Sequence, residues 1–348
     1  MHFIEIGQIM YSVHQHWDPL KLCIVGRSYP PEFYSFIKNP RVRTVLERIA
    51  QETEEDYQKL VDKLEELGVT VMRPEIQEFH NYLMKGDSRY VAPPMCPRDF
   101  TAMIGNKFYS NFNYSGLISY QKILDHIAKT NEIIQHDDIN LSSATVTRVG
   151  RDLYFGTMDK EENVDAVREK YKEQFPNYRC EVINTGGHSD GTYCPVKPGL
   201  IISLKDVPTY ADTFPDWEVV YLPGQSWGMV QEFLDLKDKN RGKWWVPGEE
   251  LNDDFTEFVE SWLSHWVGYV EETVFDVNML VVDEHTVICN NYNEQVFDAF
   301  ERHGVTPHIV NFRHRYFWDG GLHCITSDVH REGKRVDYFP ERDLTDKS

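Results

Sequence analysis

Cys324 lies in the stretch GGLHCITSD, residues 320–328, behind two glycines and next to a histidine. Such a cysteine can be a buried apolar side chain, a metal ligand or a nucleophile. A cysteine nucleophile needs a lowered thiol pKa and a partner that moves protons. The six cysteines are scattered and no two have the CxxC spacing, so the sequence favours neither a disulfide framework nor a cysteine zinc site.

A second polar cluster, NTGGHSDGTY at residues 184–193, contains His188 and Asp190. Its glycines allow the backbone to turn sharply. The two side chains point to the same side if the segment is extended, and they could then form an acid/base pair. Hydrogen bonds within a loop are the alternative. A metal site is not favoured, because this close pair is hard to complete to three or four ligands.

A third cluster, MCPRDF at residues 95–100, places Asp99 after Arg98 and before an apolar stretch. Spacing alone favours a turn aspartate or an ion pair with Arg98. In a fourth cluster, Arg151 and Asp152 are interpreted as a structural ion pair. Together the clusters offer a cysteine, a histidine and carboxylates that could hold a cationic substrate in a sheltered cleft.

The elements that must position these residues follow a repeated plan. Apolar residues recur at helical spacing in residues 56–74, and a short strand pattern follows. Residues 293–310 repeat this order, with Asn293 as an expected N-cap and Gly304 as an expected C-terminal cap. Residues 164–184 form a looser third copy.

Apolar runs of strand length lie between these helices, among them LKLCIVGR, TAMIGNKFYS, RDLYFG, GLIISL, NMLVVD and HTVICN. The chain is therefore predicted to be an α/β protein built from several similar strand-helix-strand units. Residues 252–270 are predicted to form one amphipathic helix. Its apolar face contains Phe255, Phe258, Val259, Trp262, Leu263, Trp266 and Val267. The charged tail after Tyr338 is expected to be partly disordered.

The formal net charge of −20 repels nucleic acid and anionic membranes and mildly favours cationic small molecules. The sequence has no signal-peptide pattern and no stretch apolar enough to cross a bilayer. With reduced thiols as the simplest interpretation, we expect a cytoplasmic protein without nucleic-acid or membrane partners. A homodimer is compatible with the sequence, which does not give the oligomeric state.

Six stretches resemble, in order and rough spacing, the arginine:glycine amidinotransferase family of the guanidine-modifying pentein superfamily. They are HWDPLKLCIVGR, MCPRDFTAMIGN, VGRDLYFG, GGHSDGTY, NMLVVDEHTVI and GGLHCITSDVHR. The similarity runs from Trp17 to Arg331, and MCPRD and GGLHC followed by DVHR are its most specific pieces. The resemblance implies a single domain over residues 1–348, folded as a five-bladed α/β propeller with the active site in a central channel.

The resemblance also implies roles for four residues. Cys324 matches the nucleophile, His188 the general acid/base, and Asp99 and Asp190 the carboxylates that grip a guanidinium. It implies an amidinotransferase that moves the amidino group of arginine, or a similar guanidine, to an amine through an amidino-cysteine, without a cofactor or metal. The alternatives are a hydrolase on the same scaffold and, from another class, a non-catalytic binding propeller.

One position departs from the family pattern. The family has an acidic residue upstream of GRD that orients the histidine, and the equivalent position here is Ser142. We expect Asp137 and Asp138 to lie outside the channel. A hydroxyl of Ser142 or Ser143, or water, is therefore predicted to contact His188. The arginine that holds the amino-acid carboxylate in the family is not recognisable in this sequence.

Overall fold

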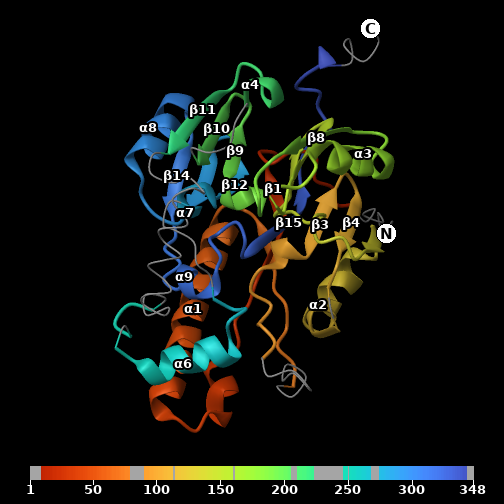
Figure 1. The fold of residues 1–348 in the computed structure, drawn as a ribbon. Coiled ribbons are helices and arrows are strands. Elements are labelled where there is room, and N and C mark those ends of the chain that lie inside the picture. Colours follow the sequence, from red (N-terminus) through yellow and green to blue (C-terminus); the bar gives the residue numbers. More distant parts are fainter. Residues whose placement is uncertain are drawn as a thin grey trace, which may run out of the picture.

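The computed structural model describes residues 9–78, 90–112, 114–159, 161–204, 210–222, 246–249, 251–267 and 274–342. Within these residues the strands form five three-stranded sheets, which occupy the upper part of Figure 1. The sheets are β15-β1-β2, β3-β4-β5, β6-β7-β8, β9-β10-β11 and β12-β13-β14. In each sheet, the middle strand is antiparallel to the first-named edge strand and parallel to the other.

The strands are β1 (Leu20–Val25), β2 (Thr70–Met72), β3 (Thr101–Ile104), β4 (Lys107–Ser110), β5 (Glu132–Gln135), β6 (Val146–Val149), β7 (Asp152–Gly156), β8 (Arg179–Ile183), β9 (Tyr193–Lys197), β10 (Leu200–Leu204), β11 (Glu218–Leu222), β12 (Leu280–Asp283), β13 (Thr286–Cys289), β14 (Thr306–Ile309) and β15 (Thr326–Arg331). The α-helices are α1 (Pro40–Glu66), α2 (Tyr114–Ile127), α3 (Val164–Gln174), α4 (Tyr210–Thr213), α6 (Asp253–Trp262), α7 (Val274–Val277), α8 (Glu294–His303) and α9 (Arg315–Trp318). Short 3₁₀ helices are η1 (Pro31–Phe36), η3 (Pro97–Asp99) and η4 (Ser189–Gly191).

One helix connects the two parallel strands of every sheet, because parallel strands cannot be joined by a tight turn. These crossover helices are α1, α2, α3, α4 and α8. The predicted repetition of strand-helix-strand units is therefore confirmed, with one addition. Each unit also has an antiparallel edge strand. TAMIGNKFYS, for example, is a hairpin of β3 and β4 that turns at Gly105, where φ is +59°.

The predicted caps of the clearest unit are confirmed. The Asn293 side chain accepts a hydrogen bond from the backbone N–H of Val296 at the start of α8. Gly304 ends this helix in the left-handed conformation, with φ at +65°. The helical pattern predicted within residues 164–184 forms α3, and the strand β8 follows it.

The helix predicted over residues 252–270 is shorter in the structure. It forms α6 and ends at Trp262, and residues 268–270 lie outside the described part of the chain. Trp266 is nevertheless buried, because it stacks near Trp318 and its indole N–H donates to the carbonyl of Tyr90. The apolar periodicity reflected burial of this segment, but part of that burial is achieved without a helix.

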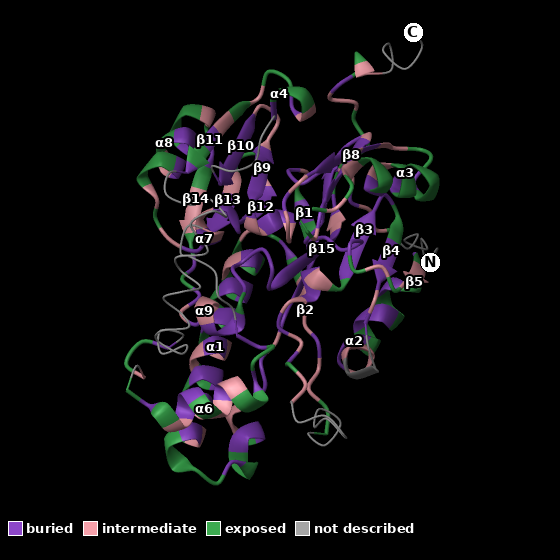
Figure 2. Ribbon diagram, viewed as in Figure 1, coloured by how far each residue is buried: buried purple, intermediate pink, exposed green. Residues whose placement is uncertain are grey.

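The middle strands are buried on both faces, and Figure 2 shows most strands in the buried colour. Every residue of β7 and β10 is buried, which explains why RDLYFG and GLIISL are continuous apolar runs in the sequence. Below the sheets in Figure 1, α1 and α6 pack together around a shared apolar core that includes Leu46 and Phe255. No helix in the described ranges is long and apolar enough to span a bilayer.

The two ends of the chain meet in one sheet, because β15 pairs with β1 and places Leu20 opposite Arg331. The described part of the tail after Tyr338 is anchored to the fold. Phe339 is buried, and Arg342 donates to the carboxylate of Asp152. Residues 343–348 of the tail lie outside the described residues.

Candidate active site

Cys324 lies in residues 320–325, a loop that connects α9 to β15 and is called the cysteine loop below. The loop packs tightly on two buried asparagines, Asn278 and Asn290. A Cβ atom at Gly321 would lie 2.6 Å from the Asn278 Oδ1 and 3.0 Å from the Asn290 Nδ2. Only glycine fits there, so the second glycine of GGLHC allows the loop to approach the asparagines.

The Asn278 amide has its orientation fixed by four contacts. Its Oδ1 accepts the backbone N–H groups of His323 at 3.1 Å and Cys324 at 3.2 Å. Its Nδ2 must therefore face the other way, where it donates to the Cys324 Sγ at 3.0 Å and to the carbonyl of Asp190 at 3.1 Å. Asn278 thus aims a hydrogen-bond donor at the sulfur, which stabilises a thiolate.

Asp190 lies on η4, so the segment is not extended as the sequence analysis assumed. The tight turn of η4 takes Asp190 down toward the cysteine loop. Its Oδ2 is 2.8 Å from the Nδ1 of His323 and 3.3 Å from the Cys324 Sγ. Its Oδ1 is buried and has no hydrogen-bond partner among the described residues.

His323 supports Asp190 as a neutral ring. Burial and the charge of Arg98 lower the pKa of His323 to about 4, so its Nδ1–H donates to the carboxylate. Burial alone would raise the pKa of Asp190, but the hydrogen bond from His323 and nearby positive charges lower it overall. Asp190 is therefore ionised at neutral pH beside the sulfur.

His188 lies beside Asp99. The Nδ1 of His188 is 3.6 Å from the Oδ1 of Asp99. Burial alone would lower the pKa of His188, but the carboxylates of Asp99, Asp190 and Asp319 raise it overall. Burial raises the pKa of Asp99 to about 6. These carboxylates therefore stabilise the imidazolium that forms when a neutral His188 accepts a proton.

A cavity of about 180 Å³ opens above the sulfur. Its lining includes Cys324, His188, Asp190, Asn278 and Asp319. The cavity therefore brings together three residues predicted from distant parts of the sequence, and the fourth, Asp99, adjoins His188. Burial and the charges of Asp190 and Asp99 raise the pKa of the Cys324 thiol well above its ordinary value. A cationic ligand would offset those charges.

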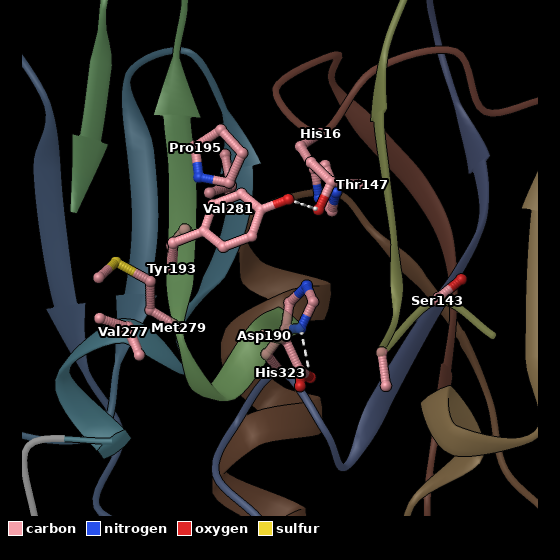
Figure 3. A pocket seen from close by; sticks show the side chains of 12 residues that line it. His16, Ser143, Thr147, Asp190, Tyr193, Pro195, Val277, Met279, Val281 and His323 are labelled. Carbon is pink, nitrogen blue, oxygen red and sulfur yellow. Dashed lines mark hydrogen bonds and ion pairs between the residues drawn. The ribbon is translucent and has the colours of Figure 1, made fainter. Parts of the chain in front are cut away.

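A second, much smaller void of about 10 Å³ lies on the other side of Asp190. Figure 3 shows His323 reaching Asp190 and the Tyr193 hydroxyl reaching Thr147 around it. Its volume suits about one water molecule, not a substrate. The buried His16 ring tilts toward His323 with centroids 5.9 Å apart.

The expected contact between Ser142 and His188 is not found. The Ser142 hydroxyl is buried 3.4 Å from the Thr145 Oγ1, because both residues belong to the turn before β6. Among the described residues, neither Ser142 nor Ser143 hydrogen-bonds to His188. Asp138 contacts Lys170 and Tyr171, away from the cavity as predicted.

The two suggested arginine–aspartate neighbours are also not ion pairs with each other. Arg98 is fully buried and pairs with Asp328 at 3.0 Å, while its Nε donates to the carbonyls of His323 and Thr326 on either side of Cys324. Asp152 pairs with Arg179 and Arg342, whereas Arg151 pairs with Asp337. Sequence neighbours point to different sides here, so each finds a distant partner.

The sequence analysis assigned no function to three residues that lie at the site: Asn278, His323 and Asp319. Asn278 stands in an apolar run and was treated as the start of a strand. Asp319 precedes GGLHC and has a positive φ of +50°, which no local pattern predicts. In the described part of the chain, no group of three or more His, Cys, Asp or Glu residues could hold a metal ion.

No family model matches the chain. It is 23% identical to inosamine-phosphate amidinotransferase 1 of Streptomyces glaucescens, over 94% of this chain and 99% of that protein. It is 21% identical to the mitochondrial glycine amidinotransferase of Xenopus tropicalis, over 94% of this chain and 84% of that protein.

Two solved amidinotransferases share the fold. The inosamine-phosphate amidinotransferase StrB1 of Streptomyces griseus has a TM-score of 0.66 at 19% identity, over 94% of this chain and 99% of that one. The amidinotransferase SxtG of Microseira wollei has a TM-score of 0.67 at 17% identity, over 95% and 100% of the two chains. The chain is therefore similar in sequence to amidinotransferases along nearly its whole length, and it shares their fold.

Proposed function

We propose that this protein transfers the amidino group of arginine, or a similar guanidine, to an amine through a covalent intermediate on Cys324. The observation that carries the proposal is the convergence of Cys324, His188 and Asp190 on one cavity. The similarity to amidinotransferases along nearly the whole chain supports the reaction class.

In the first half-reaction, Asp99 and Asp190 hold the planar guanidinium by charge-assisted hydrogen bonds. The Cys324 sulfur attacks the central carbon and forms a carbon–sulfur bond, and His188 takes up the thiol proton. The carbon–nitrogen bond to the alkyl group then breaks, and His188 gives that proton to the leaving amine. The products are a free alkylamine and an amidino group on the sulfur.

In the second half-reaction, an acceptor amine occupies the place of the amine that left. Its nitrogen attacks the amidino carbon and loses a proton to His188, and the carbon–sulfur bond breaks. The proton returns to the sulfur, so the enzyme is regenerated and a new guanidine leaves. This order predicts ping-pong kinetics.

The charges of the site favour a cationic donor at the first step. The thiol pKa is raised by burial and by the carboxylates beside it. A bound guanidinium compensates these carboxylates, so it lowers the cost of forming the thiolate that attacks it. Asn278 donates to the same sulfur and adds to this stabilisation.

We also propose that the five sheets close into a propeller around the site. Side-chain hydrogen bonds connect each unit to the next in a cycle. They join Thr101 to Ser327, Arg148 to Met103, Tyr193 to Thr147, Lys197 to His303 and Arg331 to Val281. The antiparallel edge strands β15, β3, β6, β9 and β12 would then line the central channel.

Incubation with arginine, alone and then with a panel of amines, tests the proposed reaction by mass spectrometry. Ornithine together with a new guanidine supports transfer. Citrulline with ammonia, or ornithine with urea, would instead mean that water attacks, as in a hydrolase. No product with any guanidine or amine would favour a binding protein.

The intermediate is tested on the protein itself. Arginine should leave an amidino adduct on Cys324, and Cys324→Ala should abolish both adduct and turnover while the fold survives. Cys96→Ala is the control, because the Cys96 sulfur lies beside the cysteine loop and would be 3.1 Å from a Cβ at Gly320. An adduct that persists in Cys324→Ala would reject the assignment.

A further inference from the structure

The Nδ1 of His188 has a single carboxylate neighbour in the described residues. The Oδ1 of Asp99 lies 3.6 Å away, and no other carboxylate in the described part of the chain is within ion-pair distance of the ring. Asp190 directs its Oδ2 to the Nδ1 of His323 at 2.8 Å instead. Asp319 lines the same cavity as His188 but does not pair with it. Asp99 is therefore the carboxylate placed to act on the imidazole.

The group that the sequence analysis expected beside His188 points elsewhere. The Ser142 hydroxyl lies 3.4 Å from the Thr145 Oγ1, within its own turn. Asp99 reaches the ring from another unit, because η3 ends at Asp99 just before β3, whereas His188 lies between β8 and β9. The carboxylate and the imidazole are thus brought together by the packing of two units and not by spacing along the chain.

The two oxygens of Asp99 have different surroundings. The Oδ1 on the His188 side is buried and accepts no hydrogen bond in the described part of the chain. The other oxygen is not enclosed in the same way, and the side chain as a whole is 29% exposed. A buried oxygen without a donor costs free energy, and the Nδ1–H of His188 can supply that donor. Oδ1 can thus serve His188 while Oδ2 remains open to a guanidinium.

The separation of 3.6 Å is longer than a hydrogen bond. Hydrogen bonds of catalytic groups are often long before the substrate binds, and they shorten in the complex. The side chains of His188 and Asp99 are 37% and 29% exposed, so neither is locked in place by packing. A small movement of either side chain would close the contact.

A histidine that accepts a proton must keep one ring nitrogen free of hydrogen. In the proposed reaction His188 accepts the proton of the Cys324 thiol, and both residues line the cavity. The hydrogen bonds that the two nitrogens make determine which of them carries the proton. A carboxylate at Nδ1 keeps the proton there, leaves Nε2 as the base and stabilises the imidazolium that forms.

We propose that Asp99 is a positioning residue for His188, whose Nδ1–H it holds through Oδ1 so that Nε2 serves as the base at Cys324. The inference rests on the proposed amidino transfer and deepens it. Asp99 then has two tasks, since the same carboxylate also contacts the guanidinium. It performs the task for which the sequence analysis expected a hydroxyl of Ser142 or Ser143.

Nitrogen-15 NMR of the substrate-free protein with labelled histidines tests the inference, because it distinguishes the two tautomers of the neutral ring. The signals of His188 are those that disappear in His188→Gln. Above the pH at which His188 titrates, the unmodified protein should carry the proton on Nδ1. In Asp99→Asn, which keeps the shape of the side chain, and in Asp99→Ala, the Nε2–H form should predominate.

Asp190→Asn is the matched control, because Asp190 is also assigned to the guanidinium but bonds to His323. It should keep the Nδ1–H form of His188. Burial lowers the pKa of His188, and the carboxylates of Asp99, Asp190 and Asp319 raise it, Asp99 most. The midpoint of the His188 titration should therefore move to lower pH in both asparagine variants, and further in Asp99→Asn.

An Nε2–H form in the unmodified protein, or an Nδ1–H form that persists in Asp99→Ala, would overturn the inference. The rate of Cys324 labelling by arginine gives a second readout. Both asparagine variants lose a grip on the guanidinium and at least about tenfold in rate, but Asp99→Asn should lose more because its base is misplaced.

Equal losses of rate in the two variants would mean that Asp99 only holds the guanidinium. The tautomer is measured without a donor, so its result does not depend on turnover. If no guanidine labels Cys324, the proposed amidino transfer fails, while the tautomer still decides whether Asp99 positions His188.

Discussion

At the scale of single residues, Asn278 gives the thiol a defined electrostatic environment. Its amide is held by two backbone N–H groups on one side and presents a donor to sulfur on the other. The residue is fully buried, so water does not replace either contact. The amide therefore favours the thiolate in a place where two carboxylates disfavour it.

Replacing Asn278 by Asp should raise the pKa of the Cys324 thiol. A carboxylate oxygen would face both the sulfur and the Asp190 carbonyl, so an attractive contact becomes repulsive. We expect the rate of amidino transfer to fall at least about tenfold. The measurement is the pH dependence of Cys324 alkylation by iodoacetamide, whose midpoint should move to higher pH.

Asn131→Asp is the control for Asn278→Asp. Asn131 is also buried, and its Nδ2 also donates two hydrogen bonds, here to the backbone carbonyls of Tyr11 and Asn106. This variant should lose stability but keep the alkylation midpoint of Cys324. If both variants leave the midpoint unchanged, Asn278 only supports the loop.

Asp99 links the site to the stability of the fold. Its pKa of about 6 lies above the ordinary value of about 3.9 for an unfolded aspartate. Ionisation therefore favours the unfolded chain, so this group lowers stability as pH rises through about 6. The effect is absent below about pH 4, where Asp99 is protonated in both states.

Asp99→Asn should accordingly be more stable than the unmodified protein at pH 8, by up to about 3 kcal/mol, but not at pH 4. Its transfer rate should fall at least about tenfold, because one grip on the guanidinium loses its charge. Urea denaturation at the two pH values measures the difference. The same stability difference at both pH values, or an advantage shared by the exposed Asp137→Asn, would contradict this account.

The sequence was a good guide to which reactive side chains share the cavity. It was a poor guide to the residues that position them. Cys324, His188 and Asp190 do share a cavity, and their types and motifs made them visible. Asn278 and Asp319 were not visible, because their importance depends on what packs against them. The direct contact expected between the hydroxyl of Ser142 or Ser143 and His188 is absent from the described residues for the same reason: spacing along the chain did not give the direction of the hydroxyl.

At the scale of elements, local chemistry predicted the helices that have their own caps. Asn293 and Gly304 bound α8, as their types indicate, since each satisfies backbone groups within a few residues. Helix α6 ended early because burial of Trp266 depends on Tyr90 and Trp318, which are distant in sequence. Apolar periodicity predicts which side chains are buried, whereas capping residues predict where a helix ends.

Three of the antiparallel edge strands, β6, β9 and β15, were the hardest to predict, whereas β3 and β12 lie within the apolar runs TAMIGNKFYS and NMLVVD. β6 and β15 contain buried charges, Arg148 on the first and Asp328 and Arg331 on the second. A sequence segment with such charged residues resembles a polar loop until the partners of the charges are known. β9 contains Pro195, which an edge strand tolerates. These strands are recognisable only once the sheets have assembled.

At the scale of the whole molecule, Asp328 joins units that are far apart in the sequence. Its carboxylate pairs with Arg98 at 3.0 Å, Arg148 at 2.8 Å and Arg331 at 2.9 Å, and all four side chains are buried. Burial alone would raise the pKa of Asp328, but the three arginines hold it well below its usual range. The cluster fixes β15 against the units of β3 and β6.

Asp328→Asn should destabilise the protein by about 3–5 kcal/mol, because three arginines would remain buried without their counter-charge. Chemical denaturation measures the loss. Glu132→Gln is the control. It removes an exposed ion pair with Lys107 across β4 and β5, which should cost less than about 1 kcal/mol. Similar losses in the two variants would mean that the buried cluster adds no special stability.

The pairing of β1 with β15 has a consequence for the synthesis of the protein. While the ribosome is still making the chain, β1 has its parallel neighbour β2 but lacks its antiparallel one. Pairing of such distant segments is intrinsically slow. Because the cysteine loop immediately precedes β15, the Cys324 sulfur meets Asn278 and Asp190 only late in folding. The environment proposed for catalysis is thus assembled only after β15 has been synthesised and has paired with β1.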